Sequence, residues 1–310
     1  MILCCGEALI DMIPGEMNSG QAGFVPHAGG AVFNTSIALG RLGIKTGLLT
    51  GLSTDLFGQV LEDALMASHV NTALSVRSDR PTTLAFVRLV NGHASYTFYD
   101  ENSAGRVLDR SQAPSIGDEV NAMFFGGISL AVEPCADFYA DLLIEQSGNK
   151  VVMIDPNIRP GFIRDVERYR VRLERMLRHS DVVKVSDEDL DWIVPGEAGL
   201  KDKAAKLFEF GVSVVLVTRG SEGATGFLAS GGDVTVPSRK VTVADTVGAG
   251  DTFNAGFLAS LDDANQLTKT GISSMSVETL KCALSLGGQA AAVTVSRAGA
   301  NPPWRSELDI

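Results

Sequence analysis

Short apolar segments alternate with amphipathic segments along most of this chain. The apolar segments end near Gly, Asp, Asn or Ser and fall at residues 2–10, 46–52, 121–127, 150–157, 181–186 and 212–220. Runs of this length with turn residues at their ends are typical of buried β-strands. Between the first two segments, Phe33, Ile37, Ala38 and Leu42 recur at helical spacing, and Gly43 follows as a candidate C-cap. The alternation predicts an α/β protein with a central, mostly parallel sheet sandwiched by helices.

One stretch departs from this alternation. Residues 82–100 contain two extended runs on either side of Asn91-Gly92, a dipeptide typical of a type I′ hairpin turn. With a segment at about 12–26, the stretch at about 82–102 predicts a small β lid over the sheet; a plain edge hairpin is the alternative. No repeat or linker divides the rest of the sequence, so we expect a single domain over residues 1–310.

Composition and charge exclude several classes of partner. The formal net charge is −11, which disfavours binding to nucleic acid or to an anionic membrane. No apolar run reaches 18 residues, and the first residues contain acids and no basic leader. The four cysteines lack metal-site spacing and are expected to be buried free thiols. These features predict a cytoplasmic protein.

The segment at 243–261 is the richest in candidate chemistry. An extended run ends at Ala244, the small residues Gly248-Ala249-Gly250 follow, and a helix is predicted to begin near Asp251. Glycines allow a ligand to approach the backbone, and the first amides of a helix bind anions. We interpret the turn as a phosphate cradle and Asp251 as a general base. The alternative is that Asp251 is a simple helix N-cap.

At this point the sequence resembles the ribokinase-like (PfkB) family of carbohydrate kinases, over nearly its whole length. DTVGAGD at 245–251 is similar to the family's C-terminal signature. AGGAVFNTSIALGRLG at 28–43, followed by GLSTDLFG at 51–58, is similar to its N-terminal signature. GEALIDMIP at 6–14 and DPNIR at 155–159 resemble the fructokinase branch. The resemblance implies a ribokinase-like fold, ATP as phosphoryl donor and Mg²⁺ as its companion.

The resemblance also implies a set of sugar-binding residues. A carboxylate can accept hydrogen bonds from two sugar hydroxyls, glycines let the sugar lie against backbone, and an aromatic ring can cover a sugar face. The residues matched to these roles are Asp11, Gly29, Gly30, Asn34 and Phe98. Asn157 joins them because Asp155, Asn157 and Arg159 are predicted to alternate on one face at the end of a strand.

The remaining implied residues concern the phosphoryl group, the nucleotide and metals. Arg159 would neutralise the transferring phosphoryl group together with the Gly248–Asp251 turn. Thr218, Gly220 and Gly223 resemble a nucleotide-binding loop, and Ser186 is placed beside it. Asp245 and Gly299 resemble parts of a K⁺ site. Asp189 is a candidate for holding Mg²⁺ through water.

Three departures from the family pattern bear on these roles. Ser186-x-x-Asp189 stands where many relatives have Asn-x-x-Glu. Asp100 stands where kinases of sugar acids and fructose often have arginine, and Pro303 replaces a polar residue of the cation loop. K⁺ activation therefore stays open, as does a homodimer through the lid.

A P-loop kinase is excluded because the dipeptide Gly-Lys is absent from the sequence. The favoured function is phosphorylation of fructose to fructose 6-phosphate. The alternatives are a 2-keto-3-deoxygluconate kinase, a nucleoside or aminoimidazole riboside kinase, and a catalytically silent sugar-binding regulator. Asp11 and Asp100 in the expected sugar site favour a neutral sugar; Arg88 and Arg106 are the nearby cations that would argue against this.

Overall fold

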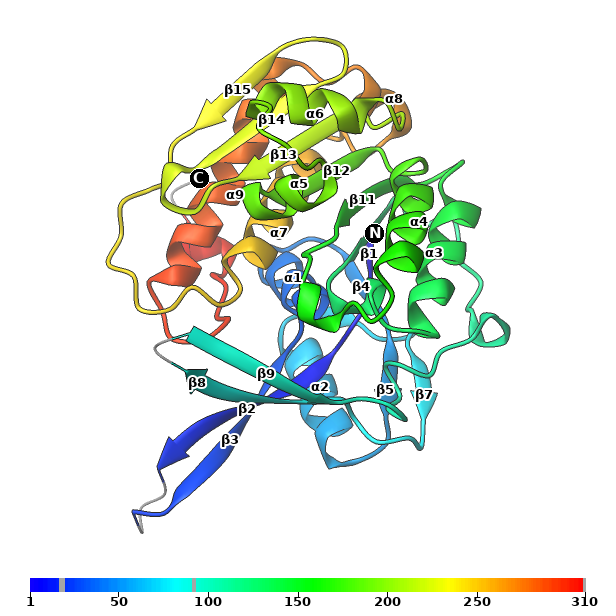
Figure 1. Ribbon diagram of the computed structural model, residues 1–310, viewed down its shortest axis with the longest axis vertical. Coiled ribbons are helices and arrows are strands. Elements are labelled where there is room, and N and C mark those ends of the chain that lie inside the picture. The colour runs from blue at the N-terminus through cyan, green and yellow to red at the C-terminus, as the bar shows by residue number, and fades with distance from the viewer. Residues whose placement is uncertain (17–19, 91–92, 309–310) are drawn as a thin grey trace.

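Side chains alternate between two apolar layers along each central strand. In β1 (Ile2–Cys5), Ile2 and Cys4 pack in one core, while Leu3 and Cys5 pack in the other. The same period of two recurs in β10 (Ala122–Gly126), β11 (Val151–Asp155), β12 (Val182–Ser186) and β13 (Val214–Thr218), so each of these strands is buried on both faces. The computed structural model describes residues 1–16, 20–90 and 93–308, and Figure 1 shows helices on both sides of this sheet.

Within the described residues this sheet has nine strands. Their order is β15-β14-β13-β12-β11-β10-β1-β4-β6. The strands from β13 to β6 run parallel, and β14 and β15 are antiparallel additions at one edge. Besides β1, the strands are β4 (Thr46–Leu49), β6 (Val70–Asn71), β10 (Ala122–Gly126), β11 (Val151–Asp155), β12 (Val182–Ser186), β13 (Val214–Thr218), β14 (Ala224–Leu228) and β15 (Asp233–Val236).

Two groups of helices cover the two faces. One core includes side chains from α1 (Ala31–Arg41), α2 (Leu56–Ala67), α7 (Ala249–Asp263), α8 (Lys269–Ser273) and α9 (Val277–Val295). The other includes side chains from α3 (Cys135–Gln146), α4 (Val166–Leu177), α5 (Asp187–Ile193) and α6 (Leu200–Phe208). Single 3₁₀ turns lie at Arg110–Gln112, Ile128–Leu130, Pro160–Phe162, Gly220–Glu222 and Arg305–Glu307. None of the helices in the described ranges is long and apolar enough to cross a membrane.

A second, four-stranded sheet projects from the body of the molecule (Figure 1). Its order is β3-β2-β8-β9, and its strands are β2 (Leu9–Glu16), β3 (Ala22–Gly29), β8 (Leu84–Val90) and β9 (His93–Tyr99). Both predicted lid segments contribute to it. The Asn91-Gly92 turn lies outside the described residues. A further two-stranded sheet pairs β5 (Gly51–Ser53) with β7 (Val76–Ser78).

Strand order reverses between β1 and β10. From β1 the chain builds outward through β4 and β6, and it later returns to build β10 to β13 on the other side. A reversal of this kind opens a crevice at the carboxyl ends of the two central strands. The sequence analysis merged β1 with the start of β2, because the apolar run continues through the break at Gly6.

Candidate functional site

Asp251 occupies the first turn of α7. The helix begins at Ala249, two residues earlier than predicted, and its N-cap is Gly248 in the left-handed region at φ 78°. The extended run that was expected to end at Ala244 is not a strand. Asp251 is therefore the third residue of the helix, and its carboxylate accepts a hydrogen bond from Asn34 Nδ2 at 2.9 Å. The N-cap interpretation of Asp251 is wrong.

Asn34 connects two helices that are distant in the sequence. It lies on α1, and its neighbour Thr35 donates to the main-chain oxygen of Asp251 at 3.2 Å. Both α1 residues are buried, and so is Asp251. Asn34 was predicted as a sugar ligand, and the structure places its amide on the carboxylate that was predicted to be the base.

Burial raises the pKa of Asp251 to about 7. The hydrogen bond from Asn34 opposes this shift because it stabilises the charged form. The negative charges of Asp155 and Glu7 raise the pKa further, and the positive charge of Lys184 lowers it. A carboxylate with a pKa near neutrality is suited to accept a proton from a hydroxyl at the start of a helix.

Asp11 lies on β2, on one face of the second sheet. An ideal Cβ on Gly29 would stand 2.3 Å from Asp11 Oδ2, so a larger residue at position 29 would push this carboxylate aside. Burial raises the pKa of Asp11 to about 6. Gly30 follows as the N-cap of α1 at φ 108°, and Asn34 comes one helical turn later. The structure thus brings the predicted residues Asp11, Gly29, Gly30 and Asn34 into one connected stretch.

The same face of the second sheet carries aromatic side chains. Phe98 packs edge-on against Phe162 with ring centroids 4.6 Å apart, which joins β9 to the loop after β11. Burial raises the pKa of Tyr96, and the charges of Asp11, Arg159 and Asp245 act on the same phenol. Tyr96 therefore lies within electrostatic reach of three residues that the sequence analysis placed in the site.

The expected alternation of Asp155, Asn157 and Arg159 on one strand face is wrong. Strand β11 ends at Asp155, which is buried and accepts hydrogen bonds from Lys184 Nζ at 2.8 Å and Asn254 Nδ2 at 2.7 Å. Asn157 has a positive φ of 45° and belongs to the following turn. Arg159 is exposed, and its guanidinium donates to the Ile158 carbonyl.

Two of the expected nucleotide residues lie side by side. Ser186 and Thr218 are register partners at the carboxyl ends of β12 and β13. The Ser186 hydroxyl also caps α5 by accepting a hydrogen bond from the Asp189 amide at 3.0 Å. Gly220 begins the 3₁₀ turn after β13, and an ideal Cβ on Gly223 would stand 2.1 Å from the Val236 carbonyl. This backbone contact and a φ of 96° both require glycine at position 223.

Asp189 and Asp245 are both engaged by backbone amides. Asp189 accepts from Ile158 N at 2.9 Å and from Ser186 N at 3.2 Å. Asp245 accepts from Gly299 N at 2.9 Å and from Val247 N at 3.1 Å. Both carboxylates therefore hold loops in place, and Asp245 lies beside Gly299, the residue that the resemblance grouped with it in a K⁺ site.

Asp100 does not present a free charge to the cleft. Its carboxylate is paired with Arg106 Nη1 at 2.8 Å, and both side chains are largely buried. Arg106 also donates to the Glu133 carbonyl. Asp11 pairs with Ala85 of β8 and shares its face of the sheet. Arg88 comes three positions after Ala85, so its side chain lies on the opposite face. Asp100 was wrongly counted as an unpaired acid.

Three residues beside Asp251 escaped the sequence analysis. Glu7 follows β1, is buried, and accepts hydrogen bonds from Ala31 N at 2.9 Å and Ser129 N at 3.3 Å, so it caps α1 where Gly30 has no side chain. The other two are Lys184 and Asn254. A lone lysine inside the apolar run DVVKVS was a usable signal, because such residues are rarely fully buried unless paired.

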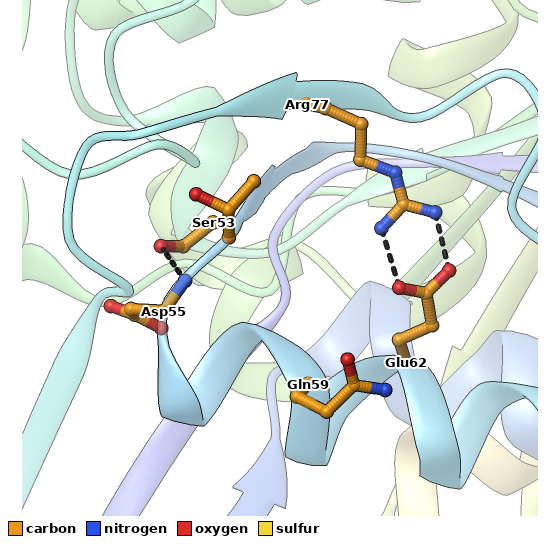
Figure 2. A pocket seen from close by; sticks show the side chains of 6 residues that line it. Ser53, Asp55, Gln59, Glu62 and Arg77 are labelled. Carbon is orange, nitrogen blue, oxygen red and sulfur yellow. Dashed lines mark hydrogen bonds and ion pairs between the residues drawn. The ribbon is translucent and has the colours of Figure 1, made fainter.

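A separate hollow of about 300 Å³ contains none of the predicted residues. Figure 2 shows its charged lining, in which Arg77 faces Glu62 in a two-pronged ion pair. Asp55, from the second half of the N-terminal signature, caps α2. Its carboxylate also accepts hydrogen bonds from the hydroxyl and the amide of Thr82. Asp55 thus anchors the segment that leads into β8.

Comparisons with known proteins point to one family. A family model described as pfkB family carbohydrate kinase matches residues 1–307. A fructokinase from Rhizobium leguminosarum bv. trifolii is 50% identical over 282 residues, covering 91% of this chain and 86% of that protein. The crystal structure of a fructokinase with bound ATP from Xylella fastidiosa has a TM-score of 0.85 at 28% identity, covering 96% and 93% of the two chains. Aminoimidazole riboside kinase from Salmonella enterica, with a TM-score of 0.81 at 22% identity, covers 96% and 94% and shares the fold.

We predict that Asp251→Asn lowers kcat about 10²–10⁴-fold, because the amide cannot accept the hydroxyl proton. The variant should fold normally, since asparagine can still bond to Asn34. Turnover and thermal unfolding measured on the same preparation check this. A variant with turnover within threefold of the wild type would contradict the assignment of Asp251 as the base.

The second prediction concerns the pH profile of kcat/KM. The base must be charged to act, so the rate of the wild type should fall as the pH drops below about 7. Asn34→Ala removes a hydrogen bond that favours the charged form, and the acid limb should move upward by roughly one pH unit. If KM for the sugar rises while the limb stays in place, Asn34 serves the sugar and not Asp251.

Proposed function

Because this chain belongs to the pfkB family of carbohydrate kinases, we propose that it transfers the γ-phosphoryl group of ATP to the primary hydroxyl of fructose. The observation that carries the chemistry is the buried Asp251 carboxylate at the first turn of α7, with its pKa raised to about 7. The 50% identity to a fructokinase supports the choice of sugar. This base also argues against a catalytically silent regulator.

In this mechanism each residue acts at a stated position. Asp251 takes the proton from the attacking hydroxyl, and the amides of Ala249, Gly250 and Asp251 receive the phosphoryl oxygens. Asp11 accepts hydrogen bonds from sugar hydroxyls above Gly29 and Gly30. Arg159 lies close enough to act on Tyr96, and we propose that it turns towards the phosphoryl group when ATP is bound.

The second sheet is proposed to act as a lid on the sugar, as part of a single domain. Phe98 and Tyr96 lie on the face that also carries Asp11, and Phe98 already packs against Phe162 of the body. An aromatic face closing over the sugar would exclude water from the reacting hydroxyl. Asn157, in the turn beside Phe162, is retained as a proposed sugar contact.

The nucleotide is proposed to lie along the carboxyl ends of β12 and β13, beside Ser186, Thr218 and the turn at Gly220–Gly223. Among the described residues, no group of three or more His, Cys, Asp or Glu side chains could hold a metal ion. We therefore propose that Mg²⁺ is held mainly by the ATP phosphates and water, as is common for this ion. Asp189, already engaged by two amides, would reach it only through water.

A K⁺ site at Asp245 and Gly299 remains part of the proposal. Each carboxylate oxygen of Asp245 accepts one amide and keeps a second lone pair for a cation. The cytoplasm is the proposed compartment, because its reducing conditions suit the free thiols of the four cysteines. Of these, Cys4, Cys5 and Cys135 are buried, and Cys282 is exposed, which corrects the expectation for that residue.

The third prediction tests the sugar. Neither Arg88 nor Arg106 offers a free cation to Asp11, because Arg106 is paired with Asp100 and Arg88 lies on the opposite face of the lid. A substrate carboxylate would meet like charge there, at a cost of several kcal/mol. We expect kcat/KM for fructose to exceed that for 2-keto-3-deoxygluconate more than tenfold in a coupled ADP-release assay.

Asp11→Ala provides the control within the same site. It should raise KM for fructose about tenfold or more, from the loss of a charged hydrogen-bond acceptor, and leave KM for ATP unchanged. A tenfold preference of the wild type for the sugar acid, or for a nucleoside, would move the protein to another branch of the family.

We also propose that the lid pairs with a second copy of this chain. Its face opposite Asp11 carries an aromatic row in which Phe86 lies between Phe24 and Tyr99, with ring centroids 5.0 and 5.5 Å away. Phe24 is 48% exposed and Tyr99 is 59% exposed. Contiguous exposed aromatics on a projecting sheet are typical of a protein interface.

The fourth prediction follows from this surface. Phe24→Ser/Tyr99→Ser should lower the mass measured by sedimentation equilibrium from that of two chains to that of one. Val171→Ser, which replaces a similarly exposed residue on α4, is the control and should leave the mass unchanged. A wild-type protein that sediments as a single chain would refute the dimer.

A further inference from the structure

A buried ion pair lies between the central sheet and the first turn of α7. Lys184 is 5% exposed and Asp155 is 2% exposed, and Lys184 Nζ lies 2.8 Å from Asp155 Oδ2. The two residues come one position after the register pair Ile154–Val183, at the carboxyl ends of neighbouring strands. Both side chains share the sheet face of Met153 and Val182, which is the face covered by α7.

The ammonium group touches the turn that was assigned to the phosphoryl group. An ideal Cβ on Gly250 would stand 3.2 Å from Lys184 Nζ. Gly250 is the second residue of α7, and the first amides of a helix have no acceptor within the helix. A positive charge therefore lies against a backbone segment that already favours an anion.

The cluster has hydrogen-bonding capacity that its own residues do not use. A lysine ammonium has three N–H donors. Within the described residues, Lys184 Nζ donates to Asp155 Oδ2. The same Asp155 oxygen accepts from Asn254 Nδ2 at 2.7 Å, and Asn254 Oδ1 is buried without a partner. Asn254 Oδ1 is an acceptor and would take a donor such as a water molecule, so it is the remaining N–H donors of Lys184 that are available to an anion.

The position of Lys184, and not the net charge of the cluster, points to an anion. Asp155 neutralises Lys184 in the free protein, and Arg159, the cation expected to serve the phosphoryl group, is exposed. A buried cation stabilises developing negative charge far more than an exposed one, because the surrounding dielectric is lower. Lys184 is the buried cation that lies beside Gly250.

We propose that Lys184 is a further catalytic residue, whose ammonium donates a hydrogen bond to a non-bridging oxygen of the γ-phosphoryl group during its transfer. This inference rests on the proposed kinase reaction. The bond from the γ-phosphorus to the ADP oxygen breaks, the bond to the sugar oxygen forms, and the hydroxyl proton passes to Asp251. Lys184 keeps its protons, and Asp155, which also accepts a hydrogen bond from Asn254, holds it in position.

The fifth prediction separates this role from a structural one. Lys184→Met should lower kcat about 10²–10³-fold, the typical effect of losing one such donor, with KM for fructose within threefold of the wild type. Because Lys184→Met leaves Asp155 buried and unpaired, the decisive variant is Lys184→Met/Asp155→Asn, which carries no unpaired charge. It should regain the thermal midpoint of the wild type and remain as slow as the single variant. Recovery of kcat to within fivefold would show that Lys184 only neutralises Asp155.

Binding of ADP with aluminium fluoride and fructose gives a second readout. This probe imitates the transferring group, so the double variant should bind it 10²–10³-fold more weakly while its affinity for ADP alone changes less than threefold. Equal losses for both ligands would overturn the proposal. A wild type that does not turn over fructose would refute the proposed function, whereas a normal wild type with an unaffected variant would refute Lys184 alone.

Discussion

The burial of one carboxylate organises the site. Removing a charged carboxylate from water is costly unless hydrogen bonds and nearby charges compensate. Asp251 is compensated by the Asn34 amide, by the amino end of α7 and by Lys184, and it is opposed by Asp155 and Glu7. These influences nearly balance, so that burial leaves the pKa of Asp251 at about 7. A fully compensated carboxylate would be too weak a base, and an uncompensated one would be protonated.

That balance requires elements from both halves of the chain. Asn34 and Asp251 are 217 positions apart, yet α1 and α7 lie side by side on one face of the sheet (Figure 1). The reversal of strand order between β1 and β10 places the loop after β1 next to the loop after β10. Glu7 uses that neighbourhood to bond to both Ala31 and Ser129.

The sequence was sufficient for features that depend on local periodicity. Short apolar runs bounded by turn residues predicted β10, β12 and β13 to within two residues, and the glycine-rich turn before Asp251 marked the start of α7 to the same accuracy. Pairings across the fold could not be obtained in this way. Periodicity gives the face on which Asp155 or Asp100 lies, but it does not give the partner, and both carboxylates proved to be held by a cation. For the same reason, the sequence predicted the region in which Asn34 lies but not its hydrogen bond to Asp251.

The second sheet shows how one thin element can have two surfaces. Successive residues of a strand point to opposite faces, so Asp11 on β2 lies on the face of Phe98 while Met12 lies on the face of Phe86. The Asp11 face is constrained by Gly29 and by the contact of Phe98 with Phe162. The Phe86 face packs against the main core through Ile10, Met12 and Leu84, and it carries the aromatic row farther out. Both faces belong to the same single layer of strands. A contact that tilts the sheet at its Phe86 face must therefore also move Asp11 relative to Asn34 and Asp251.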